Sequence, residues 1–323
     1  MKRWLSKAEV TLGNHSDRLN AINIFPVADG DTGTNLYQTV RAAAQGIQEC
    51  PETTDLGVLI NRAGRAAMEN ARGNSGTLFS VFLGAFAEPL HGHIRLSASV
   101  LATALNRAQI RAWSALSDPV PGTMLSVLEA AASAAADADA AQNGDDSNHA
   151  LSIALDAAVD AALTAVVQTE NELEALNAAK IVDAGGVGML LILDALRSTI
   201  LGVGLQDDLL ENLHGYNTDY PHIHNQMPDD DGTEVMCTID LSPLDAATLR
   251  LRLDEMGDSV IMSPVGESDA QTGNYRWRVH VHVADPGPAL ALINSLGTPA
   301  NVTLTQLAGA DSDSGHVGGE SAV

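Results

Sequence analysis

The stretch that decides the fold of the first two thirds of the chain is Asp29-Gly30-Asp31-Thr32-Gly33-Thr34-Asn35, where a Gly-rich loop passes into a helix-type sequence. Asp29 and Asp31 are hard oxygen donors separated by one glycine, and such carboxylates suit Mg²⁺ bound together with phosphate oxygens and water. Thr32, Thr34 and Asn35 add hydroxyl and amide groups where a helix begins, and helix N-termini attract anions. The same residues could instead form an Asp-Gly turn followed by a capping threonine.

Three further glycine-containing loops also precede predicted helices, so each places free backbone N–H groups at a helix N-terminus. They are Ala71-Arg72-Gly73-Asn74-Ser75-Gly76, Pro119-Val120-Pro121-Gly122-Thr123-Met124 and Asp183-Ala184-Gly185-Gly186-Val187-Gly188. The guanidinium of Arg72 could stabilise a transferring phosphoryl group. Any one of these loops could equally be a helix break or a tight turn between helices. Four of them on one helical region favour anion binding more than any single loop does.

The periodicity of the chain predicts two domains joined by a linker. Up to residue 204 the sequence shows helix after helix, which predicts an all-α domain over residues 1–204. Residues 205–232 are rich in Asp, Asn, His and Pro, and indicate a linker. Three β-type runs and two helical runs follow, so we expect a small α/β domain over residues 233–307. Residues 308–323 are rich in Gly, Ser and Asp, and we expect them to be disordered.

Composition excludes several classes of function. The chain has 41 acidic and 17 basic residues, a formal charge of −24, and no basic stripe, so we expect no nucleic-acid binding. An acidic chain that binds a nucleotide must neutralise the phosphates, and metal ions are the obvious means. Two distant cysteines, no signal-type N-terminus and no apolar run of roughly 18 residues predict a cytoplasmic protein without a membrane span.

The four loops, in this order, resemble those of the nucleotide-binding subunit of bacterial fatty acid kinase, whose kinase domain is similar to the L subunit of dihydroxyacetone kinase. The resemblance begins at Asn23-Ile24-Phe25-Pro26 and covers nearly the whole chain. It implies that the all-α domain is an antiparallel eight-helix barrel with the nucleotide at one end. It also implies a further C-terminal domain, which family members use to engage their partner and which this sequence does not include.

The resemblance assigns roles to residues of this sequence. Asp29 and Asp31 would bind two Mg²⁺ ions that bridge the ATP phosphates. Asn23 is the nearest upstream oxygen donor, where the dihydroxyacetone kinase subunit has a third aspartate, and is a weaker candidate for the metal. The resemblance further implies two sets of ligand contacts. The phosphates would contact Thr32, Thr34, Asn35, Asn74 and Ser75, and the nucleoside would contact Thr123, Met124, Asp183 and Gly185.

A second metal site is expected in the α/β domain. His280 and His282 are two residues apart on a predicted strand, so they face the same side, and Cys237 would complete a ligand set that suits zinc. Without a metal, the same residues would be two solvent-facing histidines and a buried cysteine. The resemblance implies a zinc site in this middle domain. A fourth ligand could be water or one of three further histidines, His214, His222 and His224.

The resemblance implies transfer of the ATP γ-phosphoryl group to a fatty acid carboxylate, giving an acyl phosphate and ADP. A carboxylate with a pKa of about 4–5 is already ionised, so the reaction needs charge neutralisation and positioning rather than a base. Asp29, Asp31 and Arg72 would carry the catalysis. The resemblance implies that a separate DegV-like fatty-acid-binding protein presents the substrate. A kinase of a small hydroxylated substrate such as dihydroxyacetone, a non-catalytic nucleotide-binding adaptor, and assembly as a homodimer stay open.

Overall fold

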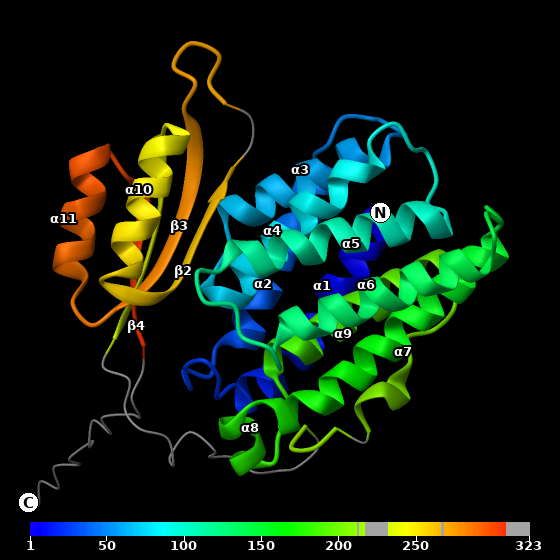
Figure 1. The fold of residues 1–323 in the computed structure, drawn as a ribbon. Coiled ribbons are helices and arrows are strands. Elements are labelled where there is room, and N and C mark those ends of the chain that lie inside the picture. The colour runs from blue at the N-terminus through cyan, green and yellow to red at the C-terminus, as the bar shows by residue number, and fades with distance from the viewer. Residues whose placement is uncertain (212, 217–231, 266–267, 308–323) are drawn as a thin grey trace, which may run out of the picture.

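The computed structural model describes residues 1–211, 213–216, 232–265 and 268–307. A mostly helical N-terminal domain lies beside a small sheet domain (Figure 1). The helical domain consists of α1 (Lys2–Ala21), α2 (Thr32–Gln48), α3 (Leu56–Glu69), α4 (Gly73–Ala87), η1 (Glu88–Leu90), α5 (Ala98–Ala115), α6 (Met124–Ala141), α7 (Asn148–Glu172), α8 (Glu174–Ala179), α9 (Ala184–Leu201) and η2 (Asp207–Leu210).

Side chains at the N-termini define where several helices begin. The side chains of Asp55, Ser97, Thr123, Ser147 and Asp183 each accept a hydrogen bond from a backbone N–H of the first turn. These acceptors satisfy donors that have no partner within the helix. The helix starts expected from the sequence at the loops before α6 and α9 are therefore confirmed.

The core of the helical domain is built from small and aliphatic side chains, with a few large aromatic ones. Trp4 on α1 is fully buried, and its Nε1 donates to the carbonyl of Ile192 on α9 at 3.0 Å. Its ring packs against Phe86 of α4 with centroids 5.8 Å apart. One buried indole thus connects three helices and fixes α9 inside the bundle.

Two helices, α7 and α9, are long and apolar enough to cross a membrane when judged by length and composition only. In the structure 78% of the apolar window of α9 and 44% of that of α7 are buried within the domain. Core helices of soluble proteins meet the same criterion, so these two helices are weak evidence for a membrane span. Their length and hydropathy differ from the expectation that the chain has no such apolar run.

The second domain is a four-stranded antiparallel sheet with two helices. Its elements are β1 (Thr233–Leu241), α10 (Pro243–Asp254), β2 (Gly257–Pro264), β3 (Tyr275–Val283), α11 (Pro286–Leu296) and β4 (Ala300–Gln306). The strand order is β2-β3-β1-β4, so the chain follows a split βαβ pattern. The α/β domain expected from the sequence is confirmed. The strand missing from that expectation is β4, whose residues are all exposed.

The two faces of this sheet have different surroundings. Val235, Cys237 and Ile239 of β1 pack with residues of α10 and α11 in one apolar core. In β1 and β3 the alternate positions point to the other face, which lies towards the helical domain (Figure 1). Polar side chains therefore gather where the two domains meet, and the site described below lies there.

Direct contacts join the domains. Ile261 of β2 is buried in the core of the helical domain and pairs with Leu116 in an isolated β-bridge. The N–H and Oγ of Ser117 both donate to the carbonyl of Val260, at 3.3 and 3.0 Å. Arg278 of β3 donates to the carbonyl of Ala71, just before α4, at 2.8 Å. These contacts hold the polar face of the sheet against the N-terminus of α4.

The predicted linker divides into two parts. Its beginning packs on the helical domain, since Leu209, Leu210, Leu213 and Tyr216 are buried in that core. Residues 217–231, together with the predicted tail at 308–323, lie outside the described residues. His222 and His224, two of the proposed fourth zinc ligands, fall in that range.

Candidate functional site

The four loops singled out in the sequence come together at one end of the helical domain. Three glycines show this, because each lies so close to a neighbouring helix that an added Cβ would touch it. A Cβ on Gly76 of α4 would lie 2.3 Å from Thr39 Oγ1 of α2. A Cβ on Gly188 of α9 would lie 2.4 Å from Leu36 of α2, and a Cβ on Gly186 of α9 would lie 3.1 Å from Val127 of α6. The helices α2, α4, α6 and α9 approach closely near their N-termini, which places their free N–H groups in one region.

Asn23 holds the first loop in shape. Its Nδ2 donates to the carbonyl of Val27 at 2.8 Å, and its Oδ1 accepts from the N–H of Thr32 at 2.8 Å. The side chain is 2% exposed. Both polar ends of Asn23 thus brace the loop that carries Asp29 and Asp31.

Asn20, which the sequence reading did not select, orients Thr34. The Oδ1 of Asn20 accepts from the Thr34 N–H at 3.0 Å, and its Nδ2 donates to Thr34 Oγ1 at 2.9 Å. Gly33 allows this approach of α1 and α2, because a Cβ there would lie 2.2 Å from the carbonyl oxygen of Ser16. The glycine between two threonines is therefore required by helix packing.

The carboxylates of Asp29 and Asp31 lie together at the start of α2. Asp31 occupies the N-cap position of α2, but its side chain makes no capping hydrogen bond and interacts with Asp29 and Asn35. Burial, and then the charge of Asp31, raise the pKa of Asp29 to about 8. Burial also raises the pKa of Asp31. Two partly buried acids without a cation disfavour double ionisation, and a divalent ion between them would reverse that preference.

The second loop faces the first. Gly73 begins α4 with φ +59°, and a Cβ there would lie 2.4 Å from Asn35 Nδ2. The Oδ1 of Asn74 is buried without a hydrogen-bond partner among the described residues, and Ser75 is half-buried. Arg72 is exposed and lines the same cleft as Asn35. An unpartnered buried amide at a helix N-terminus fits a ligand contact.

The third and fourth loops are joined by Asp183. Its Oδ2 accepts from the Gly186 N–H at 2.7 Å, and the backbone N–H of Met124 also donates to its carboxylate. Burial raises the pKa of Asp183 to about 7 despite these bonds. A Cβ on Gly185 would lie 3.5 Å from the Met124 Cβ. Thr123 Oγ1 caps α6 through the Leu125 N–H at 3.3 Å. The four residues predicted to contact the nucleoside, Thr123, Met124, Asp183 and Gly185, are therefore neighbours.

A cleft of about 1340 Å³ lies between the helical domain and the sheet. Its helical wall includes Asp31, Thr34, Asn35 and Arg72, which belong to the first two loops. Its opposite wall is formed by polar positions of β1, β3 and β4, including Glu234, Thr238, Arg276, Arg278 and Thr303. The predicted phosphate end of the site thus opens into a cleft that both domains share.

The expected zinc set is corrected in one member. Glu234, His280 and His282 each offer one ligand atom, and these atoms lie within 4.8 Å of one another. Cys237 lies in the apolar core on the other face of the sheet. Its register partner is Val279, so it alternates with the histidine positions and cannot join them. His214 instead bonds Glu170 of the helical domain at 2.6 Å.

The geometry of this cluster, defined as Glu234, His280 and His282, suits a metal ion. His280 Nδ1 lies 2.9 Å from the Ser259 carbonyl oxygen and Nε2 lies 2.9 Å from Glu234 Oε1, so both nitrogens face acceptors. Burial, and then the charge of His280, lower the pKa of His282 to about 3, and its Nδ1 has no hydrogen-bond partner among the described residues. Two histidines and a carboxylate form a zinc set with an open position.

The cluster and the aspartate pair belong to one electrostatic neighbourhood. The charge of Glu234 contributes to the raised pKa of both Asp29 and Asp31. Sequence reasoning missed Glu234 and Arg278, although the alternation Arg278-Val279-His280-Val281-His282 already placed an arginine on the histidine face. No local sequence signal brings Glu234 to that face, because strand register decides it.

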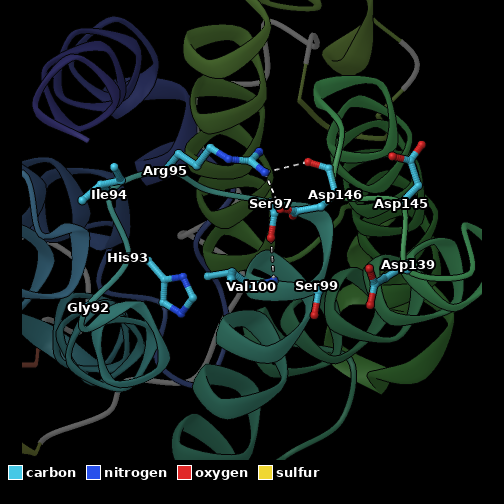
Figure 2. A pocket seen from close by; sticks show the side chains of 11 residues that line it. Gly92, His93, Ile94, Arg95, Ser97, Ser99, Val100, Asp139, Asp145 and Asp146 are labelled. Atoms are coloured by element: carbon cyan, nitrogen blue, oxygen red, sulfur yellow. Dashed lines mark hydrogen bonds and ion pairs between the residues drawn. The ribbon is translucent and has the colours of Figure 1, made fainter.

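A second cavity, of about 490 Å³, lies at the other end of α6 (Figure 2). It is lined by the loop before α5 and the loop between α6 and α7. Its arginine, Arg95, forms an ion pair with Asp146, as the figure shows. Helix α6 spans 18 residues, about 27 Å, so this cavity is remote from the four loops.

Comparisons with known proteins agree with this arrangement. Residues 26–198 match the DAK2 domain, and residues 232–313 match the middle domain of the FakA-like fatty acid kinase family. The protein YloV of Bacillus subtilis (strain 168) is 29% identical over 289 residues, which cover 86% of this chain and 50% of YloV. An uncharacterized protein of Staphylococcus haemolyticus is 26% identical, with 85% and 49% covered. The chain spans about half the length of these curated relatives.

Among solved structures, dihydroxyacetone kinase from C. freundii in complex with AMP-PNP and Mg²⁺ is similar, with a TM-score of 0.45 and 24% identity. The similarity covers 61% of this chain and 33% of that enzyme. The DAK2 match extends from just before the aspartate pair to the end of α9, more than half of the sequence. This chain belongs to the DAK2 domain family.

Proposed function

We propose that this chain is the ATP- and magnesium-binding subunit of a fatty acid kinase. The DAK2 and fatty-acid-kinase-type middle domains indicate a kinase-type subunit. The observation that carries the finer proposal is the partly buried pair Asp29 and Asp31, placed among four helix N-termini and open to a cleft. The two carboxylates disfavour joint ionisation unless cations bind them, which fits two Mg²⁺ ions. The helix N-termini beside them favour anions, which fits a nucleotide polyphosphate.

The phosphates would lie against the first two loops. The hydroxyls of Thr32, Thr34 and Ser75 and the amide NH₂ groups of Asn35 and Asn74 offer donors there. The unpartnered Asn74 Oδ1 is an acceptor, so it fits a metal ion or a donor group of the ligand. The nucleoside would lie towards Thr123, Met124, Asp183 and Gly185. Bound magnesium supplies charge neutralisation at the phosphates. Asp29 and Asp31 would hold that charge in place. Arg72, which lines the same cleft, would interact with the transferring group.

The reaction forms a bond between an acceptor carboxylate oxygen and the γ-phosphorus, and breaks the bond from that phosphorus to the β–γ bridging oxygen. The products are an acyl phosphate and ADP. The acceptor is already ionised at neutral pH, so no side chain has to remove a proton. This fits a site whose described groups are acids, amides, hydroxyls and arginines, which position and neutralise.

The further parts of the proposal concern partners and the second metal. A separate DegV-like fatty-acid-binding protein would present the acyl chain, in a cytoplasmic setting and without nucleic acid or stable membrane insertion. Zinc would bind Glu234, His280 and His282, with water in the open position. The antiparallel eight-helix barrel belongs to the proposal too, with the six-residue α8 left outside the count. Assembly as a homodimer is compatible with it.

Two other functions are tested by the same chemistry. A dihydroxyacetone-type kinase would need to activate a hydroxyl, and an adaptor would bind Mg·ATP without transfer. The assay incubates the chain, Mg·ATP, a fatty acid and a fatty-acid-binding protein with hydroxylamine, which converts an acyl phosphate to a hydroxamate. We expect hydroxamate from the unaltered protein and from Asp139→Asn, a half-buried control at the far end of α6, and none from Asp31→Asn. Transfer to dihydroxyacetone alone would contradict the proposal.

A further inference from the structure

The wall that the sheet domain contributes to the cleft carries a buried arginine. Arg278 of β3 lines the cleft, yet its side chain is only 5% exposed. Its Nη2 donates to the Ala71 carbonyl at 2.8 Å and contacts the sulfur of Met236 at 3.7 Å, while Nε is buried without a hydrogen-bond partner among the described residues. A guanidinium has five N–H donors, so most of them stay unused, and neither a carbonyl nor a thioether balances its positive charge.

The charge of Arg278 has no counter-ion within the described part of the chain. Glu234, on the same wall of the cleft, forms its ion pair with His280 at 2.9 Å. Arg72 of the helical wall also lacks an ion pair among the described residues, but it is exposed, so water screens its charge. Arg278 is removed from water. Buried arginines of this kind are typically completed by a carboxylate or a phosphate, which the planar guanidinium binds with two hydrogen bonds.

The surroundings of Arg278 favour one kind of anion. Its register partner on β1 is Thr238, and the facing wall of the cleft includes Asp31 and Asn35. Leu304 of β4 lies on the face of the sheet that α10 and α11 cover, because it pairs with a residue of that apolar core. A phosphate group, which is polar on all sides, therefore fits beside this arginine better than a carboxylate that carries a hydrocarbon chain.

The position of Arg278 relates it to one end of the proposed nucleotide. Ala71, which accepts its hydrogen bond, precedes Arg72 and Gly73 at the N-terminus of α4. Residues of the first two loops line the cleft, whereas the residues proposed for the nucleoside are absent from its described lining. The sheet domain therefore faces the phosphate end of the site. A triphosphate that extends from the nucleoside loops into the cleft brings its terminal phosphate closest to Arg278.

We propose that Arg278 of the sheet domain binds the terminal phosphate of the nucleotide, across the cleft from the first two loops. This inference rests on the proposed function, since it assigns a protein ligand to the phosphoryl group that is transferred.

The proposal gives Arg278 a defined part in the reaction. Its guanidinium neutralises charge on the non-bridging oxygens of the phosphoryl group while the acceptor oxygen bonds to the γ-phosphorus and the bond to the bridging oxygen breaks. Arg278 gives up no proton in this step. The sheet domain is then part of the catalytic site, and its contact with Ala71 sets where the guanidinium lies.

The test compares the affinities of Mg·ADP and Mg·AMP-PNP, an analogue that keeps the third phosphate, by calorimetry on the full chain. Arg278→Met should weaken Mg·AMP-PNP binding about tenfold or more, as expected for loss of a charge-assisted contact, and leave Mg·ADP binding unchanged. Arg278→Lys should keep part of the Mg·AMP-PNP affinity. Arg252→Met removes the same charge from the exposed surface of α10, outside the cleft, and should keep both affinities.

The ratio of the two affinities separates the outcomes. Unchanged Mg·ADP binding shows that Arg278→Met is folded; if this variant does not fold, Arg278→Lys decides through the same ratio. Equal losses for both nucleotides, or no loss for either, would overturn the inference and leave the proposed function standing. If the unaltered protein binds neither nucleotide, the proposed function fails, and binding of inorganic phosphate, followed by phosphorus NMR, decides instead. Phosphate binding that is lost in Arg278→Met would support an anion site at this arginine, and binding that persists there, or none to the unaltered protein, would overturn it.

Discussion

Replacing Asp31 by Asn should make the protein more stable in the absence of metal and unable to use magnesium. The change keeps the size of the side chain and removes one charge of a partly buried pair. In the unaltered protein, burial and the charge of Asp31 raise the pKa of Asp29 from 3.8 to about 8. Because Asp31 makes no capping bond to α2, the substitution does not weaken that helix end.

The size of the effect follows from proton linkage. A carboxyl whose pKa is raised on folding keeps a proton that the unfolded chain releases, so stability is lost as pH rises from 3.8 towards 8. At about 1.36 kcal/mol per pKa unit, the roughly 3 units up to pH 7 set a ceiling of about 4 kcal/mol. Burial is the larger cause and the cleft admits solvent, so Asp31→Asn should recover about 1–2 kcal/mol. For a domain of about 200 residues this raises Tm by roughly 2–8 °C.

Thermal unfolding between pH 5 and pH 8, with and without Mg²⁺, measures this gain in stability and its dependence on pH and on the metal. The metal-free unaltered protein should lose stability as pH rises and regain it with Mg²⁺, while Asp31→Asn should show a smaller slope and no response to Mg²⁺. Asp139→Asn, half-buried at the far end of α6, should behave like the unaltered protein. A less stable metal-free Asp31→Asn, or a metal-free protein that gains stability from pH 5 to pH 8, would refute the reasoning.

Asp183→Asn keeps a hydrogen-bond acceptor for the N-terminus of α9 but removes the ionisable group. Because burial raises the pKa of this carboxyl to about 7, the unaltered protein should lose up to about 4 kcal/mol of stability between pH 4 and 7 on its account. Urea unfolding at several pH values should show that this loss is absent in Asp183→Asn. Gly73→Ala should lower stability by about 1–2 kcal/mol for its φ of +59° and weaken ADP binding by displacing Asn35; normal ADP affinity would argue against that contact. His282→Ala should reduce the zinc content measured by elemental analysis and Cys237→Ser should not; the reverse result would restore the cysteine to the ligand set.

Local patterns were sufficient for the helical domain and for the small α/β domain. Capping residues such as Ser97 and Thr123 mark the beginnings of helices, and each Gly-rich loop can be identified from its own sequence. Strand β4 was missed because an exposed edge strand lacks the alternation of apolar and polar residues that a half-buried strand shows.

The parts of the site that depend on pairing could not be read from the sequence. Cys237 and the two histidines alternate correctly within their own strands, but the register of β1 against β3 decides whether they share a face. The same register brings Glu234 to His280, and domain packing brings Arg278 to Ala71, 207 residues away. Such long-range contacts leave no local signal.

The central claim is that Asp29 and Asp31 form a magnesium-dependent nucleotide site. Calorimetric titration of ADP into the protein tests it most directly, with Mg²⁺ and then with excess chelator. The account predicts binding of one ADP per chain that requires Mg²⁺, is abolished in Asp31→Asn and is retained in Asp139→Asn. ADP binding that is equally tight without Mg²⁺ or in Asp31→Asn, or no binding under any condition, would contradict it.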